Sequence, residues 1–272
     1  RGEEHISNTP KQILLYQALG YAVPQFAHLP MILGQSGKKL SKRDAATSVL
    51  DYKRDGYLPN ALLNYLVRLG WAHGDQEIFA KDELIECFTL SNVQKKGAVF
   101  DPEKLNWVNS VYIKQAESAS LFEIMLRDTV PALAGKLGSW SLDKKNTAID
   151  LYKDRVVTLS SMAHALINLH DGPERYAQED IEKWINEDVL NHLRYVCDSF
   201  TPLSEWTSDL IKHAVKDVSK QAGVKLVAIA QPLRIALIGS SDGPGVFGLL
   251  AVVGKVETIR RIKMLLNHIT KE

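Results

Sequence analysis

The stretch Gly37-Lys38-Lys39-Leu40-Ser41-Lys42-Arg43-Asp44 is the most distinctive local feature of this 272-residue sequence. It places four cationic side chains within six positions, in a loop that follows an apolar segment at 29–33. Such a loop suits a polyanion, because lysine supplies a mobile charge, serine a hydroxyl, and glycine lets backbone N–H groups turn toward a phosphate. A basic cluster is also common on solvated surfaces. The residues alone therefore leave a phosphate-binding loop and a plain surface patch both open.

The neighbouring segments favour the phosphate-binding loop. Lys39-Leu40-Ser41-Lys42-Arg43 is similar to the second signature of class I aminoacyl-tRNA synthetases, the mobile K-x-S-K-S/R loop that closes over ATP. Further segments along the chain resemble bacterial glutamyl-tRNA synthetases, in the same order: Arg1-Gly2-Glu3-Glu4-His5, Asn8-Thr9-Pro10, Ala18-Leu19-Gly20, His28-Leu29-Pro30, Asp55-Gly56-Tyr57-Leu58-Pro59, Ala61-Leu62-Leu63-Asn64-Tyr65-Leu66, Val99-Phe100-Asp101, Lys104-Leu105-Asn106-Trp107 and Gln231-Pro232-Leu233-Arg234. The resemblance covers nearly the whole chain.

The resemblance implies a ligase that activates glutamate with ATP and then transfers it to its tRNA. ATP would bring Mg²⁺ as part of the substrate, and we expect no protein-bound metal. The residues that match the family's catalytic loop are Lys39, Ser41 and Lys42. Lys42 and Lys39 would neutralise charge on the ATP phosphates, an electrostatic role in which positioned charge dominates.

The remaining site residues follow from the same resemblance. The ATP-binding set contains Lys39, Lys42 and Arg43, with the backbone of Met31 and Ile32 against adenine. The glutamate-binding set contains Arg1, Glu4 and His5, where a planar guanidinium suits a carboxylate. The anticodon-binding set contains Arg155 and Arg234.

The sequence contains neither an H-I-G-H-like signature nor an initial Met. It therefore resembles the C-terminal part of the enzyme, and we expect this chain by itself to bind tRNA and the anticodon without catalysing the reaction. Two alternatives stay open: a stand-alone helical tRNA-binding module, and an interaction scaffold without ligase activity.

Composition predicts a soluble protein, which we also expect to be cytoplasmic and monomeric. Hydrophobic residues make up 45% and charged residues 24%, the net charge is +1, and no apolar run is long enough to span a membrane. Nucleic-acid contacts must then come from local patches, one at 38–54 and one in the tail with Lys255, Arg260, Arg261 and Lys263. The two cysteines, Cys87 and Cys197, predict reduced thiols and no zinc site.

Apolar periodicity predicts a mainly α protein in four parts. These are the end of a class I α/β catalytic domain (1–48), a helical stem-contact domain (49–117) and two helical anticodon-binding subdomains (118–177 and 178–272). The small polar residues at 116–120 predict a linker between domains.

Three more local expectations concern the second half of the chain. We expect one long helix from Leu142 to Leu169 that carries Arg155, a short helix that begins at Pro232, and a turn at 239–245. Glutaminyl-tRNA synthetases share the class I core but recognise the anticodon with β-barrels, so the helical tail favours the glutamyl type.

Overall fold

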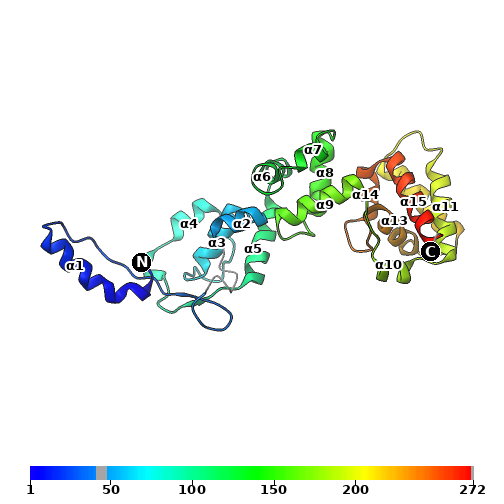
Figure 1. Ribbon diagram of the computed structural model, residues 1–272. Helices are drawn as coiled ribbons and strands as arrows, with labels where there is room; N and C mark the ends of the chain where they lie inside the picture. The colour runs from blue at the N-terminus through cyan, green and yellow to red at the C-terminus, as the bar shows by residue number, and fades with distance from the viewer. Residues whose placement is uncertain (41–47, 271–272) are drawn as a thin grey trace. The chain divides into compact units, whose positions relative to one another are not determined.

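The computed structural model describes residues 1–40 and 48–270. The chain divides into two compact units, Arg1–Tyr112 and Ile113–Glu272. Both units consist mainly of helices, which confirms the predicted fold class (Figure 1).

The first unit combines short helices with one pair of strands. Its strands β1 and β2 are parallel, with Ile32 opposite Ala98 and Leu33 opposite Val99. Trp71, Phe79 and Leu84 form a buried cluster under α3 and α4. The elements are η1 (Glu3–Asn8), α1 (Thr9–Ala18), β1 (Ile32–Leu33), α2 (Val49–Asp55), α3 (Pro59–Arg68), α4 (Lys81–Cys87), η3 (Leu90–Asn92), β2 (Ala98–Val99) and α5 (Pro102–Gln115), whose last residues belong to the second unit.

The second unit is built from helices joined by turns and loops, and its described residues, 113–270, contain no strand. Its core comes from the apolar faces of α11, α12, α13 and α15, where Leu193, Val215, Leu233 and Ile262 are fully buried. The elements are α6 (Ser118–Ile124), the π-helical η4 (Met125–Thr129), α7 (Leu133–Leu137), α8 (Leu142–Tyr152), α9 (Leu159–Asp171), α10 (Gln178–Trp184), α11 (Glu187–Phe200), α12 (Ser208–Gln221), α13 (Val227–Ile238), α14 (Val246–Val253) and α15 (Lys255–Ile269).

The single helix expected from Leu142 to Leu169 is wrong, because the chain forms α8 and α9 with a turn between them. Thr158 has extended backbone angles, and its hydroxyl accepts a hydrogen bond from Ser161 N, so it caps a new helix. Arg155 therefore lies in the turn between α8 and α9 rather than on a helix.

Two further boundaries also differ from the sequence-based expectation. Ser118 begins α6 instead of forming part of a linker, because its buried hydroxyl donates to Asp150 Oδ1 at 2.6 Å. Pro232 lies inside α13 and does not open a helix; apolar burial of the surrounding face outweighs the loss of one backbone N–H. The turn expected at 239–245 is confirmed between α13 and α14.

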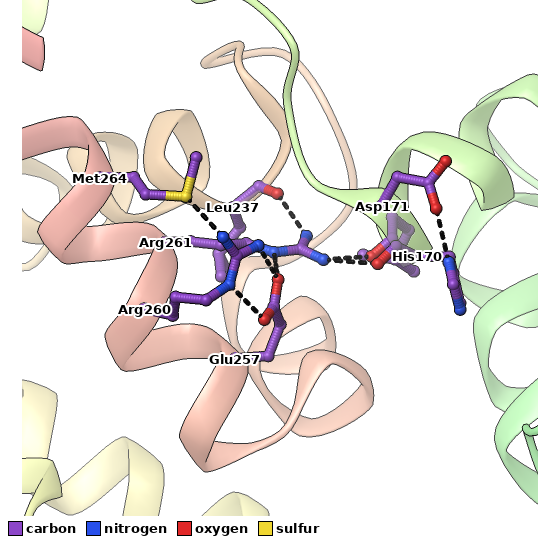
Figure 2. Close-up of polar contacts among 8 residues, drawn as sticks. His170, Asp171, Leu237, Glu257, Arg260, Arg261 and Met264 are labelled. Carbon is purple, nitrogen blue, oxygen red and sulfur yellow. Dashed lines mark hydrogen bonds and ion pairs between the residues drawn. The ribbon is translucent and has the colours of Figure 1, made fainter.

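A buried guanidinium joins three helices of the second unit (Figure 2). Arg261 of α15 is 1% exposed. Its Nη2 donates to the carbonyls of Leu169 and His170 at 2.9 Å, near the end of α9, and its Nη1 donates to Leu237 O at 2.8 Å, near the end of α13. Its Nε donates to Glu257 Oε1 at 2.7 Å. Helix C-terminal carbonyls carry partial negative charge, so this cation satisfies two helix ends at once.

We predict that Arg261→Met destabilises the second unit. Removing the guanidinium would leave the carbonyls of Leu169, His170 and Leu237 without this donor, and losing one partner of a buried ionic network costs about 3–5 kcal/mol. Urea unfolding monitored by circular dichroism measures the change. Arg260→Met is the matched control, because Arg260 also pairs with Glu257 but is half exposed. Equal losses for the two variants would contradict a special role for the buried arginine.

Glu257 makes part of this stability depend on pH. Hydrogen bonds from Arg260 and then Arg261 outweigh the effect of burial and lower the pKa of Glu257 from 4.5 to about 2. A carboxyl whose pKa is lower in the folded state stabilises above its unfolded pKa and loses that contribution as pH falls through the folded pKa.

We therefore predict that the free energy of unfolding decreases as the pH falls from about 4.5 to about 2. Glu257→Gln should be less stable than the unsubstituted chain at neutral pH and should lose less stability over that acid range. Chemical unfolding at a series of pH values measures both effects. Glu205→Gln, at an exposed position, is the control and should leave the pH profile unchanged.

Candidate nucleotide and nucleic-acid sites

The described start of the basic loop is held against β1. Gly34 N donates to Lys38 O at 2.8 Å, and Leu40 N donates to Ile32 O at 2.9 Å. The turn between them needs Gly37, whose φ of +72° is unfavourable for residues with a Cβ. The chain thus reverses and brings Lys39 alongside β1. Ser41, Lys42 and Arg43 lie outside the described residues.

Lys39 contacts one of the predicted glutamate-binding residues. Its Nζ donates to Glu4 Oε1 at 2.8 Å, and both side chains are accessible to solvent. This hydrogen bond is the main reason why the pKa of Glu4 is lowered. Gly2 makes room for the pair, since a Cβ at that position would lie 2.1 Å from Glu4 Oε2. Lys39 and Glu4 thus belong to one exposed charged site.

The first residues of the chain are fastened to the segment before β1. Leu29 N donates to Arg1 O at 2.7 Å, and Glu3 N donates to Leu29 O at 2.8 Å. The Glu3 carboxylate accepts from Met31 N at 3.1 Å. Arg1 and Met31, expected to bind glutamate and adenine, therefore lie on adjacent segments, and the Glu3 carboxylate, which the sequence interpretation did not include, holds the Met31 backbone.

His5 is placed by the start of α1. Its carbonyl accepts from the Thr9 hydroxyl at 3.3 Å, and the same hydroxyl lies 2.8 Å from His28 Nε2. His5 Nδ1 lies 3.4 Å from Asn8 Nδ2. His5 thus follows directly after Glu4 on η1, with one ring nitrogen in a local contact.

The expected adenine segment also borders an apolar cavity of about 320 Å³ in the first unit. Met31 and Ile32 line it together with Trp71 and Phe88. The neighbouring strand approaches closely because residue 97 is glycine: a Cβ there would lie 2.9 Å from Met31 O. The backbone at 31–33 is therefore tightly constrained by its neighbours.

In the second unit, Arg234 organises residues 239–245, which we call the glycine-rich loop. Its Nε donates to Pro244 O at 2.9 Å, and its Nη1 donates to Ser241 O at 2.8 Å and to the side chain of Gln231. Burial, and secondarily the charge of Arg155, lowers the pKa of Arg234. Much of its hydrogen-bonding capacity thus holds the loop.

Asp180 of α10 fixes the same loop through other atoms. Its carboxylate accepts from Ser241 N at 2.7 Å, from Ser240 Oγ at 3.0 Å and from Ser241 Oγ. Burial raises the pKa of Asp180, but the hydrogen bonds from the two serines outweigh it, so the pKa is lowered overall. The sequence shows two adjacent serines beside glycines, which suggests hydrogen-bond donors in this loop. It does not show that the carboxylate of Asp180 accepts from them.

Arg155 approaches the loop at its tip. Its Nη1 lies 3.5 Å from Asp242 Oδ1, and the two side chains are 52% and 93% exposed. The two arginines expected to contact the anticodon thus both contact the glycine-rich loop, although 79 positions separate them in sequence (234 − 155). Asp242 was not among the predicted site residues.

The basic patch predicted in the tail loses Arg261, which is buried, and three of its four members have structural partners. Arg261 is buried, and Arg260 donates to Glu257. Lys255 Nζ donates to the carbonyls of Thr201 and Leu203 at 2.7 Å. The positions 258, 261, 262, 265 and 266 repeat with helical spacing and are all buried, so this spacing was the signal that Arg261 faces the core.

Residues 1–40 and 48–270 contain no group of three or more His, Cys, Asp or Glu side chains arranged to hold a metal ion. Over the same residues, no helix has the length and apolar character needed to cross a membrane.

Two family models match this chain. Residues 1–107 match the catalytic domain of class I tRNA synthetases (E and Q), and residues 111–266 match the anticodon binding domain. The chain belongs to the anticodon binding domain family. The second model covers most of the unit that contains Arg155, Arg234 and the glycine-rich loop.

Several relatives of this chain are glutamate–tRNA ligases. The ligase of Syntrophotalea carbinolica is 41% identical, over 99% of this chain and 57% of the relative. The ligase of Thermodesulfovibrio yellowstonii is 42% identical, over 98% of the chain and 58% of the relative. A crystal structure of a glutamate tRNA ligase from Elizabethkingia meningosepticum, in complex with its amino acid, matches with a TM-score of 0.80 at 29% identity, over 98% of this chain and 56% of that one. The resemblance to glutamyl-tRNA synthetases is confirmed, and the chain spans little more than half the length of these relatives.

Proposed function

We propose that this chain is the tRNA- and anticodon-binding portion of a glutamate–tRNA ligase. The observation that carries the proposal is the meeting of Arg155 and Arg234 at one anchored loop, in the unit that matches the anticodon binding domain family. Arg234 and Asp180 hold the backbone of this loop in one conformation. The guanidinium of Arg155 is exposed, so its N–H groups are available to a ligand from solvent.

The two arginines would act differently on RNA. Arg155 is exposed enough to donate directly to a base, and one bidentate arginine–base contact discriminates by about 1–3 kcal/mol. Arg234 would contribute mainly by holding the glycine-rich loop in a shape that fits an unstacked base, because single-stranded RNA is recognised through splayed bases.

The first unit would supply part of the activation site. We propose that Lys39, Ser41, Lys42 and Arg43 contact the ATP phosphates, with Mg²⁺ bound to ATP. The backbone of Met31 and Ile32 would meet adenine. Glutamate would bind to Arg1, Glu4 and His5. The contact between Lys39 and Glu4 supports placing this glutamate-binding set next to the ATP-binding set.

The parent ligase would then act in the cytoplasm, as a monomer, on glutamate, ATP and the tRNA for glutamate. We also propose the fourfold division into a catalytic remnant (1–48), a stem-contact domain (49–117) and two anticodon-binding subdomains (118–177 and 178–272).

We predict that the chain binds the tRNA for glutamate more tightly than variants changed only in the anticodon. Binding at two salt concentrations measures both the preference and the contribution of phosphate contacts, since each phosphate contact makes affinity fall with salt. Arg155→Ala should reduce the preference by about five- to tenfold, the lower part of what one arginine–base contact provides. Its unfolding midpoint should stay unchanged, because the side chain is half exposed.

Lys212→Ala is the matched control, since Lys212 is an exposed cation on α12 away from the glycine-rich loop in sequence. It should change affinity equally for all tRNAs. Equal binding of the unsubstituted chain to every anticodon variant would contradict the anticodon assignment while leaving general RNA binding in place.

A stand-alone tRNA-binding module is the second candidate, favoured by the match of residues 111–266, more than half of this chain, to the anticodon binding domain. We predict that the 272-residue chain assayed alone gives no glutamate-dependent exchange of pyrophosphate into ATP, because class I adenylation needs both signatures around the phosphates. Exchange above background would show that this chain activates glutamate unaided. An intact relative, such as the ligase of Syntrophotalea carbinolica, is the positive control.

A further inference from the structure

The tip of the glycine-rich loop combines rigid backbone with one exposed carboxylate. The backbone on either side of Asp242 is held by Arg234, through Ser241 O and Pro244 O, and by Asp180, through Ser241 N. Asp242 N itself donates to Ser240 Oγ at 3.1 Å. The backbone position of Asp242 is therefore set by contacts that do not involve its own carboxylate.

Among the described residues, the Asp242 carboxylate has one polar partner, Arg155 Nη1 at 3.5 Å, and its side chain is 93% exposed. Exposed ion pairs at such a distance are weak, so a ligand can replace this one. The pair also has a defined chemistry: an arginine only donates hydrogen bonds, and an ionised aspartate only accepts them. Two such groups side by side match a ligand that offers an acceptor and a donor together.

A nucleobase edge has this combination, whereas a phosphate at neutral pH offers acceptors and negative charge alone. We propose that Asp242 is a specificity-determining residue, which repels RNA phosphates from Arg155 and favours a base edge that donates to the carboxylate while accepting from the guanidinium. This inference rests on the proposed function and assigns it one further residue. Discrimination then arises from a repulsive element as well as from an attractive one.

The neighbouring charges agree with this role. Arg234 is a second cation at the loop, and its guanidinium is occupied by Ser241 O, Pro244 O and Gln231. Of these two arginines, Arg155 is therefore the more open to a phosphate, and Asp242 is the carboxylate beside it. Asp180, the nearby acid on α10, is engaged with the two serines.

The test is Asp242→Asn, assayed for binding to the tRNA for glutamate and to variants with a single changed anticodon base, at several salt concentrations. The amide keeps the size of the side chain but removes the charge. We expect the altered tRNAs to bind about fivefold more tightly or better, so that the preference for the native anticodon falls by that factor. We also expect the plot of log affinity against log salt to steepen by about 0.7–0.9, the value for one added phosphate contact.

Two companion variants make the result specific. Asp217→Asn removes one exposed carboxylate from α12 and should give the unsubstituted preference, which controls for net charge. Asp242→Glu keeps the charge and should retain most of the preference. Circular dichroism and the unfolding midpoint should be the same for all, because the loop is anchored by Arg234 and Asp180.

Each outcome has a defined meaning. An unchanged preference and salt slope for Asp242→Asn, in a chain that does prefer the native anticodon, would overturn the role of Asp242 and leave the proposed function standing. If Asp242→Asn bound every tRNA more weakly by the same factor, the specificity role of Asp242 would also be overturned, since the carboxylate would then be a contact common to all tRNAs. No preference in the unsubstituted chain would overturn the proposed function itself.

Discussion

The second unit depends on a positive charge that has been taken out of water. Arg261 exchanges hydration for carbonyls at the ends of α9 and α13 and for the carboxylate of Glu257, all within 2.9 Å. A buried cation is tolerated only when its donors are satisfied, so this arrangement fixes where both helices end. Gly172 completes it, because a Cβ at that residue would lie 3.2 Å from Arg261 Nε and its φ of +88° suits glycine.

This constraint reaches the candidate RNA site through the chain. Helix α9 begins just after the turn that carries Arg155, and α13 carries Arg234 and leads into the glycine-rich loop. Because the Arg261 guanidinium binds the ends of both α9 and α13, it fixes these two helices relative to each other. Arg155 and Arg234 are therefore attached to the same rigid part of the unit. Asp180 and Arg234 then fix the loop at a smaller scale. Recognition needs such preorganisation, because every group ordered only on binding reduces affinity.

The sequence predicted the helical architecture and many boundaries because these depend on local chemistry. Pro59 opens α3 and a glycine follows its end, as short-range stereochemistry requires. It failed where a helix cap or a tertiary contact overrules the apolar pattern. The apolar stripe from 142 to 169 continues through the break at Thr158, whose hydroxyl caps a new helix, and Ser118 begins α6 because its hydroxyl donates to Asp150. The resemblance supplied Arg155 and Arg234, but only the structure shows what they contact: Asp242 and the backbone of one loop.

The parallel pairing of β1 with β2 has a consequence for how the first unit folds. Ile32 and Ala98 are neighbours in space, yet helices α2, α3 and α4 lie between them in sequence. Closing so long a loop costs chain entropy before any pairing energy is gained, so non-local contacts of this kind form slowly. The intervening helices shorten the effective loop if they form first. The strand that positions Lys39 is therefore completed by residues that emerge from the ribosome well after it, and the first unit cannot mature strictly in the order of its synthesis.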